Sequence, residues 1–500
     1  MQKTDQFRAN LLRPPPLLRS FLRSEFWPKS INFKFTVYVY AAIVLYLFLG
    51  PQDRNHNFAL NAFWCYWWPL SFVAYPFLGR IWCSICPFMI YGELVQSLRI
   101  ASGAKLMKWP REASDKWGYL FLFSLFAAIL IWEEVWDLPQ TAYLSSCLLL
   151  LITAGAMIGS FFYERRIWCR YLCPIGGMNG LFSKMAMTEL RATQGVCSAE
   201  CTTYTCYKGG SAIPPEGLES PGCPLYSHPA QLADNRNCVL CMECLKACPH
   251  RSVEFRMRLP GADLWNSSHQ PIPEELALAF ILLGSVELHK LPLVLEDLGL
   301  GVHEHLILSD KGYHILASVL ILAFPGITAW SVYLIWRFMA KISSVGSLKP
   351  SFAFQTTNMV DKETQKAVDV LSRATESYAG LSSNLAIVAP AKPFSEIGYG
   401  YLPLVWSSIL AYYLDLLLLE AGHILEVAGS SVGIDPSWLP AWEANPAVVT
   451  FLQGSTILLG ISSSLVLSRK IVGQPWRLFL PQCICIIGFG AELWHVILHK

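Results

Sequence analysis

The clearest chemistry in this sequence lies in a run of cysteines. Between Cys238 and Pro249, three cysteines are separated by gaps of two residues, and a fourth follows after three residues and precedes the proline. This spacing is typical of a segment that binds [4Fe-4S] clusters, in which the first three thiolates hold one cluster and the fourth reaches another. The pattern therefore predicts a second set of cysteines.

A second set lies just upstream, at Cys197, Cys201 and Cys206, and it ends in its own Cys223-Pro224. The spacing of this second set is irregular, so the prediction of clusters rests on the run that begins at Cys238. We expect two [4Fe-4S] clusters, one bound by Cys197, Cys201, Cys206 and Cys248 and one bound by Cys223, Cys238, Cys241 and Cys244. Zinc is the alternative for cysteines in fours, and disulfides are the alternative in an oxidising compartment.

Two further cysteine pairs follow an identical tetrapeptide. Arg-Ile-Trp-Cys occurs at residues 80–83 and 166–169, and these copies continue to Cys86-Pro87 and Cys173-Pro174. The repeat indicates an internal duplication. Because both copies follow apolar segments that end on the same side, Cys83, Cys86, Cys169 and Cys173 could meet and hold a third iron-sulfur cluster. The alternative is two redox-active or structural pairs.

Histidines and glutamates recur near the ends of apolar segments in the second half of the chain. Glu420 and His423 are three residues apart, and so are Glu492 and His495, which places each pair on one helical face. Three more polar residues are expected at the same depth, namely Glu287, His289 and His314. Such a set suits a di-iron site, a b-type haem or a quinone pocket. Alternatively, the side chains pair with each other at the membrane surface.

The composition indicates the elements that position these residues. The chain is 53% hydrophobic and 15% charged, with a mean hydropathy of +0.38 and 18 tryptophans, as in polytopic membrane proteins. We predict an all-α polytopic fold with an inserted α+β two-cluster ferredoxin-like domain. Nine segments are long enough to span a bilayer: residues 34–50, 58–79, 117–136, 141–162, 274–294, 312–336, 400–426, 447–468 and 475–497.

Basic residues predict the orientation. Lys and Arg follow each even-numbered segment, whereas the odd-numbered exits carry few, and such residues mark cytoplasmic loops. The amino terminus and the cluster domain should therefore be cytoplasmic and the carboxyl terminus outside, in a bacterial-type inner membrane or a thylakoid-like membrane. A reducing cytoplasm disfavours disulfides. The net charge of +2 gives no reason to expect nucleic acid.

The predicted organisation has six parts. They are a cytoplasmic amino-terminal segment (1–33), four spans with two cysteine motifs (34–190), the cluster domain (191–272), two spans (273–340), a cytoplasmic linker (341–399) and three spans (400–500). The linker is polar and serine-rich, with one weakly helical stretch at residues 362–377.

The cysteine motifs resemble those of the membrane polyferredoxins of the NapH, NosR and CcoG type. The resemblance is carried by Cys83–Pro87, Cys169–Pro174 and Cys238–Pro249, and it covers roughly residues 30–260. It implies electron transfer between cytoplasmic or quinol donors and redox partners at or beyond the membrane. The first pair has two intervening residues where the group usually has three, and no flavin domain precedes the spans.

These patterns favour a membrane electron-transfer protein. A cytoplasmic donor, ferredoxin-like or flavoprotein-like, would reduce the clusters, and a membrane partner, the quinone pool or an outer-face site would accept the electrons. One alternative is a membrane oxidoreductase acting on a lipid-soluble substrate at the His/Glu set. Another is an assembly factor that reduces a metal ion for a different complex.

Overall fold

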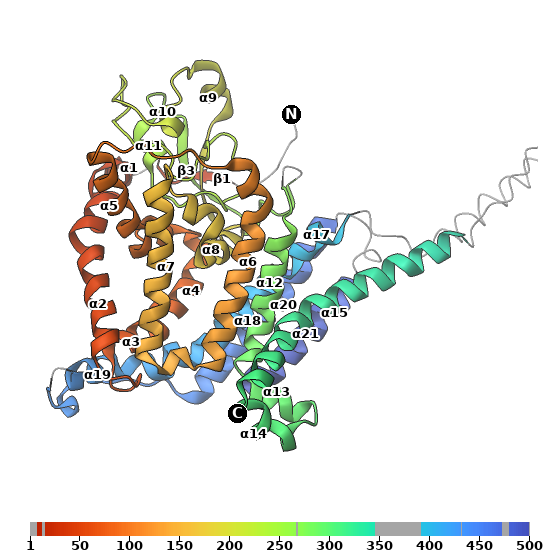
Figure 1. Ribbon diagram of the computed structural model, residues 1–500. Helices are drawn as coiled ribbons and strands as arrows, with labels where there is room; N and C mark the ends of the chain where they lie inside the picture. Colours follow the sequence, from red (N-terminus) through yellow and green to blue (C-terminus); the bar gives the residue numbers. More distant parts are fainter. Residues whose placement is uncertain are drawn as a thin grey trace, which may run out of the picture.

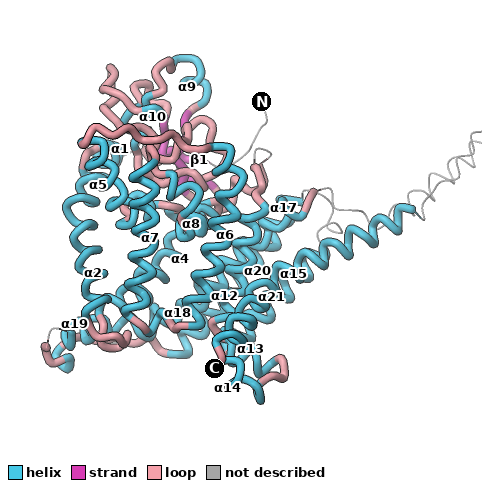
Figure 2. The backbone as a smooth tube through the Cα atoms, in the orientation of Figure 1, coloured by secondary structure: helices cyan, strands magenta, loops and turns pink. Residues whose placement is uncertain are grey.

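The protein is a helical bundle with a small domain at one end (Figures 1 and 2). The computed structural model describes residues 8–12, 16–266, 269–345, 392–431, 433–472 and 480–499. Helices dominate, and a three-stranded sheet lies in the small domain, so the predicted fold class is confirmed in these broad terms. Most of the predicted linker, including its weakly helical stretch, lies outside the described residues.

Eight helical segments of the described part are long and apolar enough to cross a membrane. The regular helices within or forming these segments are α2 (Val37–Leu49), α5 (Pro87–Ala101), α6 (Arg111–Val135), α7 (Ala142–Phe162), α15 (Lys311–Val345), α18 (Leu402–Asp415), α20 (Pro446–Val472) and α21 (Leu480–Leu498). The protein therefore has the helices of a multi-pass membrane protein. A total of nine spans among the described residues is reached only if one bent helix pair counts as a span.

That bent pair is α12 (Pro273–Leu288) with α13 (Leu291–Asp297), which meet at an angle of 82°. Pro292 stands in the first turn of α13, where a proline is tolerated because the first helical N–H groups lack intrahelical partners. The fifth predicted span is thus an apolar helix that breaks where the proline indicated.

The second predicted span is helical, but it is not apolar enough to be among the eight membrane-spanning segments. Residues Phe58–Leu78 form α3 (Phe58–Asn61), the π-helix η3 (Ala62–Trp67) and α4 (Trp68–Leu78). Tryptophan, tyrosine and proline fill this stretch, and they lower its mean hydropathy. The segment Ile81–Ala101, which contains α5 and was not predicted as a span, meets the test instead.

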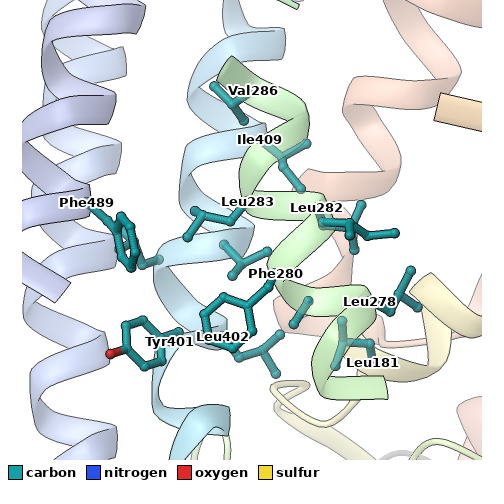
Figure 3. Close-up of a cluster of buried hydrophobic side chains, with 14 of the residues drawn as sticks. Leu181, Leu278, Phe280, Leu282, Leu283, Val286, Tyr401, Leu402, Ile409 and Phe489 are labelled. Atoms are coloured by element: carbon teal, nitrogen blue, oxygen red, sulfur yellow. The ribbon is translucent and has the colours of Figure 1, made fainter. Parts of the chain in front are cut away.

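Helix α12 is the centre of the largest apolar core. Figure 3 shows Leu278, Phe280 and Leu283 of α12 among side chains of α8, α18 and α21. Burial of apolar surface on all its faces explains why α12 is hydrophobic all round. Through Leu181 of α8 (Pro174–Ser183), the same core reaches the second cysteine motif.

The small domain is built on an antiparallel sheet of order β1-β3-β2. Strand β3 (Val253–Arg258) pairs with β2 (Thr188–Ala192) and with β1 (Arg8–Asn10). The sheet therefore includes residues on both sides of the predicted 191–272 domain boundary. Three short helices carry or flank the cysteines, namely α9 (Gln194–Glu200), α10 (Thr205–Lys208) and α11 (Glu243–Ala247).

A buried ion network joins this domain to the bundle. Lys184, which is 0% exposed, lies 2.6 Å from Glu275 of α12 and 3.5 Å from Asp234 of the small domain. The Tyr399 hydroxyl donates to Glu275 at 2.8 Å. Burial opposes ionisation of Asp234, but Lys184 and Arg236 lower its pKa to about 2. Because buried charges are costly when unpaired, this network fixes the position of the small domain.

Candidate metal-binding sites

The four cysteines predicted for one cluster line a single cavity. Cys197, Cys201, Cys206 and Cys248 all face it, although they come from three separate short helices or their ends. Tyr204 has a positive φ of 56°, so the chain turns sharply between Cys201 and Cys206. We call this group site A. The irregular spacing of the set therefore does not prevent its members from meeting.

The four cysteines predicted for the other cluster line a different cavity. Cys223, Cys238, Cys241 and Cys244 face it, and we call this group site B. Leu240 and Met242 both adopt left-handed backbone conformations, with φ values of 53° and 63°. These two residues flank Cys241 and turn the chain so that neighbouring cysteines face one side. The ligand roles of sites A and B remain predictions, but the required convergence is present.

The thiols of both sites form no disulfide bonds, and that of Cys206 is buried. All sixteen cysteines are free of disulfide bonds. Burial, followed by the nearby thiols of Cys248 and Cys197, raises the pKa of Cys206 to about 12. A buried thiol of this kind becomes a thiolate only when a cation compensates the charge, as a bound metal does.

The number of cysteines at each cavity suits a [4Fe-4S] cluster. Each cavity is lined by four cysteines, and a [4Fe-4S] cluster is held by four thiolates that each bind a different iron. The cysteine chemistry therefore fits [4Fe-4S] clusters.

The two copies of Arg-Ile-Trp-Cys form similar structures. Cys86 precedes Pro87 at the start of α5, and Cys173 precedes Pro174 at the start of α8. The Gly176 backbone N–H donates to the Cys173 sulfur at 3.2 Å, and the Met89 N–H makes the equivalent bond to Cys86. Helix N-termini favour negative charge, so these backbone donors partly offset the cost of a thiolate at both second cysteines.

The four cysteines of these copies, which we call the rim site, lie inside the bundle. Helix α5 packs along α7, and Gln96 donates to the carbonyls of Ser160 and Tyr163 at the end of α7. Cys86 is ten residues before Gln96, which corresponds to about 15 Å of helix. A Cβ at Gly155 of α7 would overlap the Trp168 ring, so this glycine admits the second copy into the bundle.

Site B and the rim site are neighbours. Cys83 and Cys169 pack in one buried apolar group with Leu225 and Val239, and Cys223 and Cys241 of site B pack against the same group. Asn179 of α8 also donates to the Cys83 sulfur at 3.3 Å. The small domain thus covers the rim site directly.

The predicted His/Glu set divides into separate pairs at the opposite end of the bundle. Glu420 pairs with Arg54 at 2.7 Å, His423 with Glu426 at 2.7 Å, and His495 with Asp297 at 3.1 Å. Glu287 and Glu492 interact electrostatically with each other. The His314 Nε2 atom is buried without a hydrogen-bond partner in the described part of the chain. The two Glu-x-x-His motifs therefore do not share one centre.

His289 has partners that the sequence reasoning missed. Its Nδ1 atom lies 3.1 Å from Glu134, its Nε2 atom lies 3.9 Å from Glu133, and its ring stacks on Tyr412. Two adjacent glutamates at the end of the apolar third span were a signal that could have identified these partners.

Comparisons with known proteins identify the cysteine motifs. A family model described as a 4Fe-4S binding domain matches residues 60–105 and 147–189, which contain the four rim-site cysteines. The ferredoxin-type protein MauN of Paracoccus denitrificans, named for methylamine utilization, is 26% identical over 160 residues, covering 29% of this chain and 54% of MauN. No solved structure matches the chain.

Two other relatives have similar coverage. An uncharacterised protein of Methanocaldococcus jannaschii is 26% identical over 193 residues, covering 37% of this chain and 66% of that protein. The putative electron transport protein YccM of Escherichia coli is 27% identical over 116 residues, covering 23% of this chain and 28% of YccM. The chain thus spans less than two thirds of these relatives. The matches confirm the predicted resemblance to membrane polyferredoxins and support iron-sulfur electron transfer.

Proposed function

We propose that this protein passes electrons from a cytoplasmic donor through [4Fe-4S] clusters at sites A, B and the rim site to an acceptor in or beyond the membrane. The observation that carries the proposal is the convergence of two cysteine sets, one of them irregular, on two separate cavities. When bound, each cluster accepts and releases one electron at a time.

The residues of the chain supply position and environment. Site A would be held by Cys197, Cys201, Cys206 and Cys248, and site B by Cys223, Cys238, Cys241 and Cys244. Since Cys248 follows the three site B cysteines after a short helix, the chain that binds one cluster also anchors the next. Site B in turn contacts the rim site through a shared apolar group. This succession supports electron movement from the small domain into the bundle.

A cleft offers access to site B. It has a volume of about 940 Å³, and its walls include Cys241, Lys246, Glu93 and Arg166. It lies between the small domain and α5, on the side that we propose to be cytoplasmic. A donor reaching this cleft would meet Cys241 without first contacting the bundle core.

Iron analysis tests the three sites. Anaerobically purified protein should contain about twelve iron atoms per chain if all three sites bind clusters and about eight if only sites A and B do. The double variant C83S/C169S should lose about four iron atoms and one paramagnetic signal of the reduced protein. The matched control is Cys147→Ser on α7, which should retain the full iron content. Iron-free protein would overturn the proposal.

Orientation needs a separate measurement. An impermeant thiol reagent added outside intact cells should not label a single cysteine placed at Glu219, in the small domain. The same reagent should label a cysteine placed at Trp438, near the opposite end of the bundle. Both variants keep the native cysteines, so that only the added cysteine differs. The reverse pattern would overturn the proposed direction.

A second candidate function is favoured by one observation. His289 lies between two carboxylates and against a tyrosine, as expected for a site that exchanges protons with a substrate in the membrane. An outer-face oxidoreductase would therefore use His289 rather than the two Glu-x-x-His motifs. His289→Gln should then abolish turnover of a lipid-soluble substrate while the cluster signals persist. Unchanged turnover would exclude this candidate.

A further inference from the structure

The two copies of Arg-Ile-Trp-Cys are bonded to each other through their arginines. The Arg80 Nη2 atom of the first copy donates to the Cys169 carbonyl of the second at 3.0 Å. The Arg166 Nη1 atom of the second copy donates to the Cys83 carbonyl of the first at 3.2 Å. Each arginine thus holds the first cysteine of the opposite copy, and the two copies form one closed unit.

The two arginines differ in how their charges are compensated. Both are buried, with Arg80 2% and Arg166 7% exposed. Arg166 lies 2.5 Å from Glu93, so its charge is already balanced. Arg80 instead donates to the Cys169 and Arg236 carbonyls, and its Nε atom has no hydrogen-bond partner in the described residues.

An uncompensated guanidinium in a buried site is costly unless an anion lies beside it. The described residues offer no carboxylate that pairs with Arg80, but its guanidinium interacts with the Cys83 sulfur. Four thiolates around a cluster would supply the missing negative charge. The positive charge of Arg80 and the negative charge of four thiolates therefore complement each other. Arg166 has no such need, because Glu93 already balances its charge.

We infer that Arg80 sets the reduction potential of the cluster at the rim site, whereas Arg166 is a positioning residue. This inference rests on the proposed function, because it requires a cluster at the rim site. Reduction adds one electron to an already negative group, and no bond or proton needs to move. Since nearby positive charge favours the reduced state, Arg80 raises the potential.

The experiment is a redox titration of the full-length protein, followed by electron paramagnetic resonance. The rim signal is the one that disappears in C83S/C169S. Arg80→Gln should make this site at least about tenfold harder to reduce, which is a shift of about 59 mV to more negative potential. Arg80→Lys keeps the charge and should restore most of the potential. The signals of sites A and B should not move.

Two control variants separate charge from position. E93Q/R166Q removes a balanced pair, so it should broaden or weaken the rim signal with a smaller shift in potential. Arg99→Gln on α5, whose guanidinium contacts the Phe161 ring instead of a cysteine, should change nothing. If Arg80→Gln prevents cluster binding altogether, Arg80→Lys must recover the signal near its native potential.

The outcomes distinguish this inference from the proposed function. If the iron content of C83S/C169S is unchanged, the rim site binds no cluster. Both the proposed cluster there and the role of Arg80 would then be wrong. A rim signal that is present, but has the same potential in native protein and in Arg80→Gln, would overturn the role of Arg80 alone. Failure of Arg80→Lys to recover a signal lost in Arg80→Gln would also overturn it.

Discussion

The cysteine end and the histidine end of the bundle contrast sharply. At the cysteine end, residues distant in sequence converge, so that two groups of four line separate cavities and a third group is joined by crossed arginines. At the other end, the predicted His/Glu set falls into separate pairs. Cysteines in recognisable motifs therefore predict a shared site better than equal depth in a bundle does.

The largest effect that tests this comparison should come from a single site A cysteine. Cys206→Ser is expected to lower the iron content by about four atoms per chain, because one of four ligands is lost, and to leave site B intact. Iron and sulfide analysis measures this change. Cys485→Ser, in α21 and away from the small domain, is the control. If Cys206→Ser keeps its full iron content, the site A cysteines do not bind a cluster together, and the contrast between the two ends would disappear.

Breaking the buried junction should have the next largest effect. Lys184→Met removes the nearest cation from Glu275 and leaves Arg236, at 3.7 Å, as its remaining partner, so it should lower the free energy of unfolding by about 3 kcal/mol. Chemical denaturation followed by the cluster absorbance would measure it. The double variant K184M/E275L removes both charges and should recover part of the loss. If the single variant is as stable as native protein, the small domain is held by other contacts.

Acid should weaken the same junction to a smaller extent. Burial, followed by Lys184, lowers the pKa of His269 from 6.5 to about 4. The unfolded chain therefore takes up a proton as the pH falls below 6.5, before the folded chain does, and stability is lost between pH 6.5 and 4. Denaturation midpoints at several pH values should fall less steeply in His269→Gln. An identical slope in both proteins would contradict this assignment.

The smallest effects are expected at the opposite end. His423→Ala and His495→Ala each remove one partly exposed ion pair and should change stability by less than about 1 kcal/mol. Optical and paramagnetic spectra should match those of native protein. Should either variant lose a haem band or a bound metal, a partner that the described pairs do not include must complete that site, and the contrast between the two ends would disappear.

The sequence indicated which cysteines lie around each cavity, because backbone spacing limits where thiolates can lie, while their roles as ligands stay predictions. The tight run from Cys238 implied that Cys223 and Cys248 would exchange between sites, and both lie in the expected cavities. The identical tetrapeptides indicated duplication. Their arginine crossing could not be predicted, because the bond between Arg80 and Cys169 depends on how the two copies pack against each other.

Other features were missed for identifiable reasons. Helix α5 was missed because it carries Glu93, Gln96 and Arg99, so the mean hydropathy of Ile81–Ala101 is only 1.2. At the far end, equal depth was taken as proximity. Glu134 pairs with His289 there, and Arg54 pairs with Glu420. Side chains outside the predicted set therefore determine the pairing.

The buried junction at Lys184 also determines an order of events during synthesis. Cys248 leaves the ribosome before Glu275 and long before Tyr399, yet these later residues cover the base of the domain that carries the cysteines. At the usual speed of translation, the interval between Cys248 and Tyr399 lasts on the order of ten seconds. Iron delivered during that interval therefore reaches the cysteines while the junction at Lys184 still lacks its last partner.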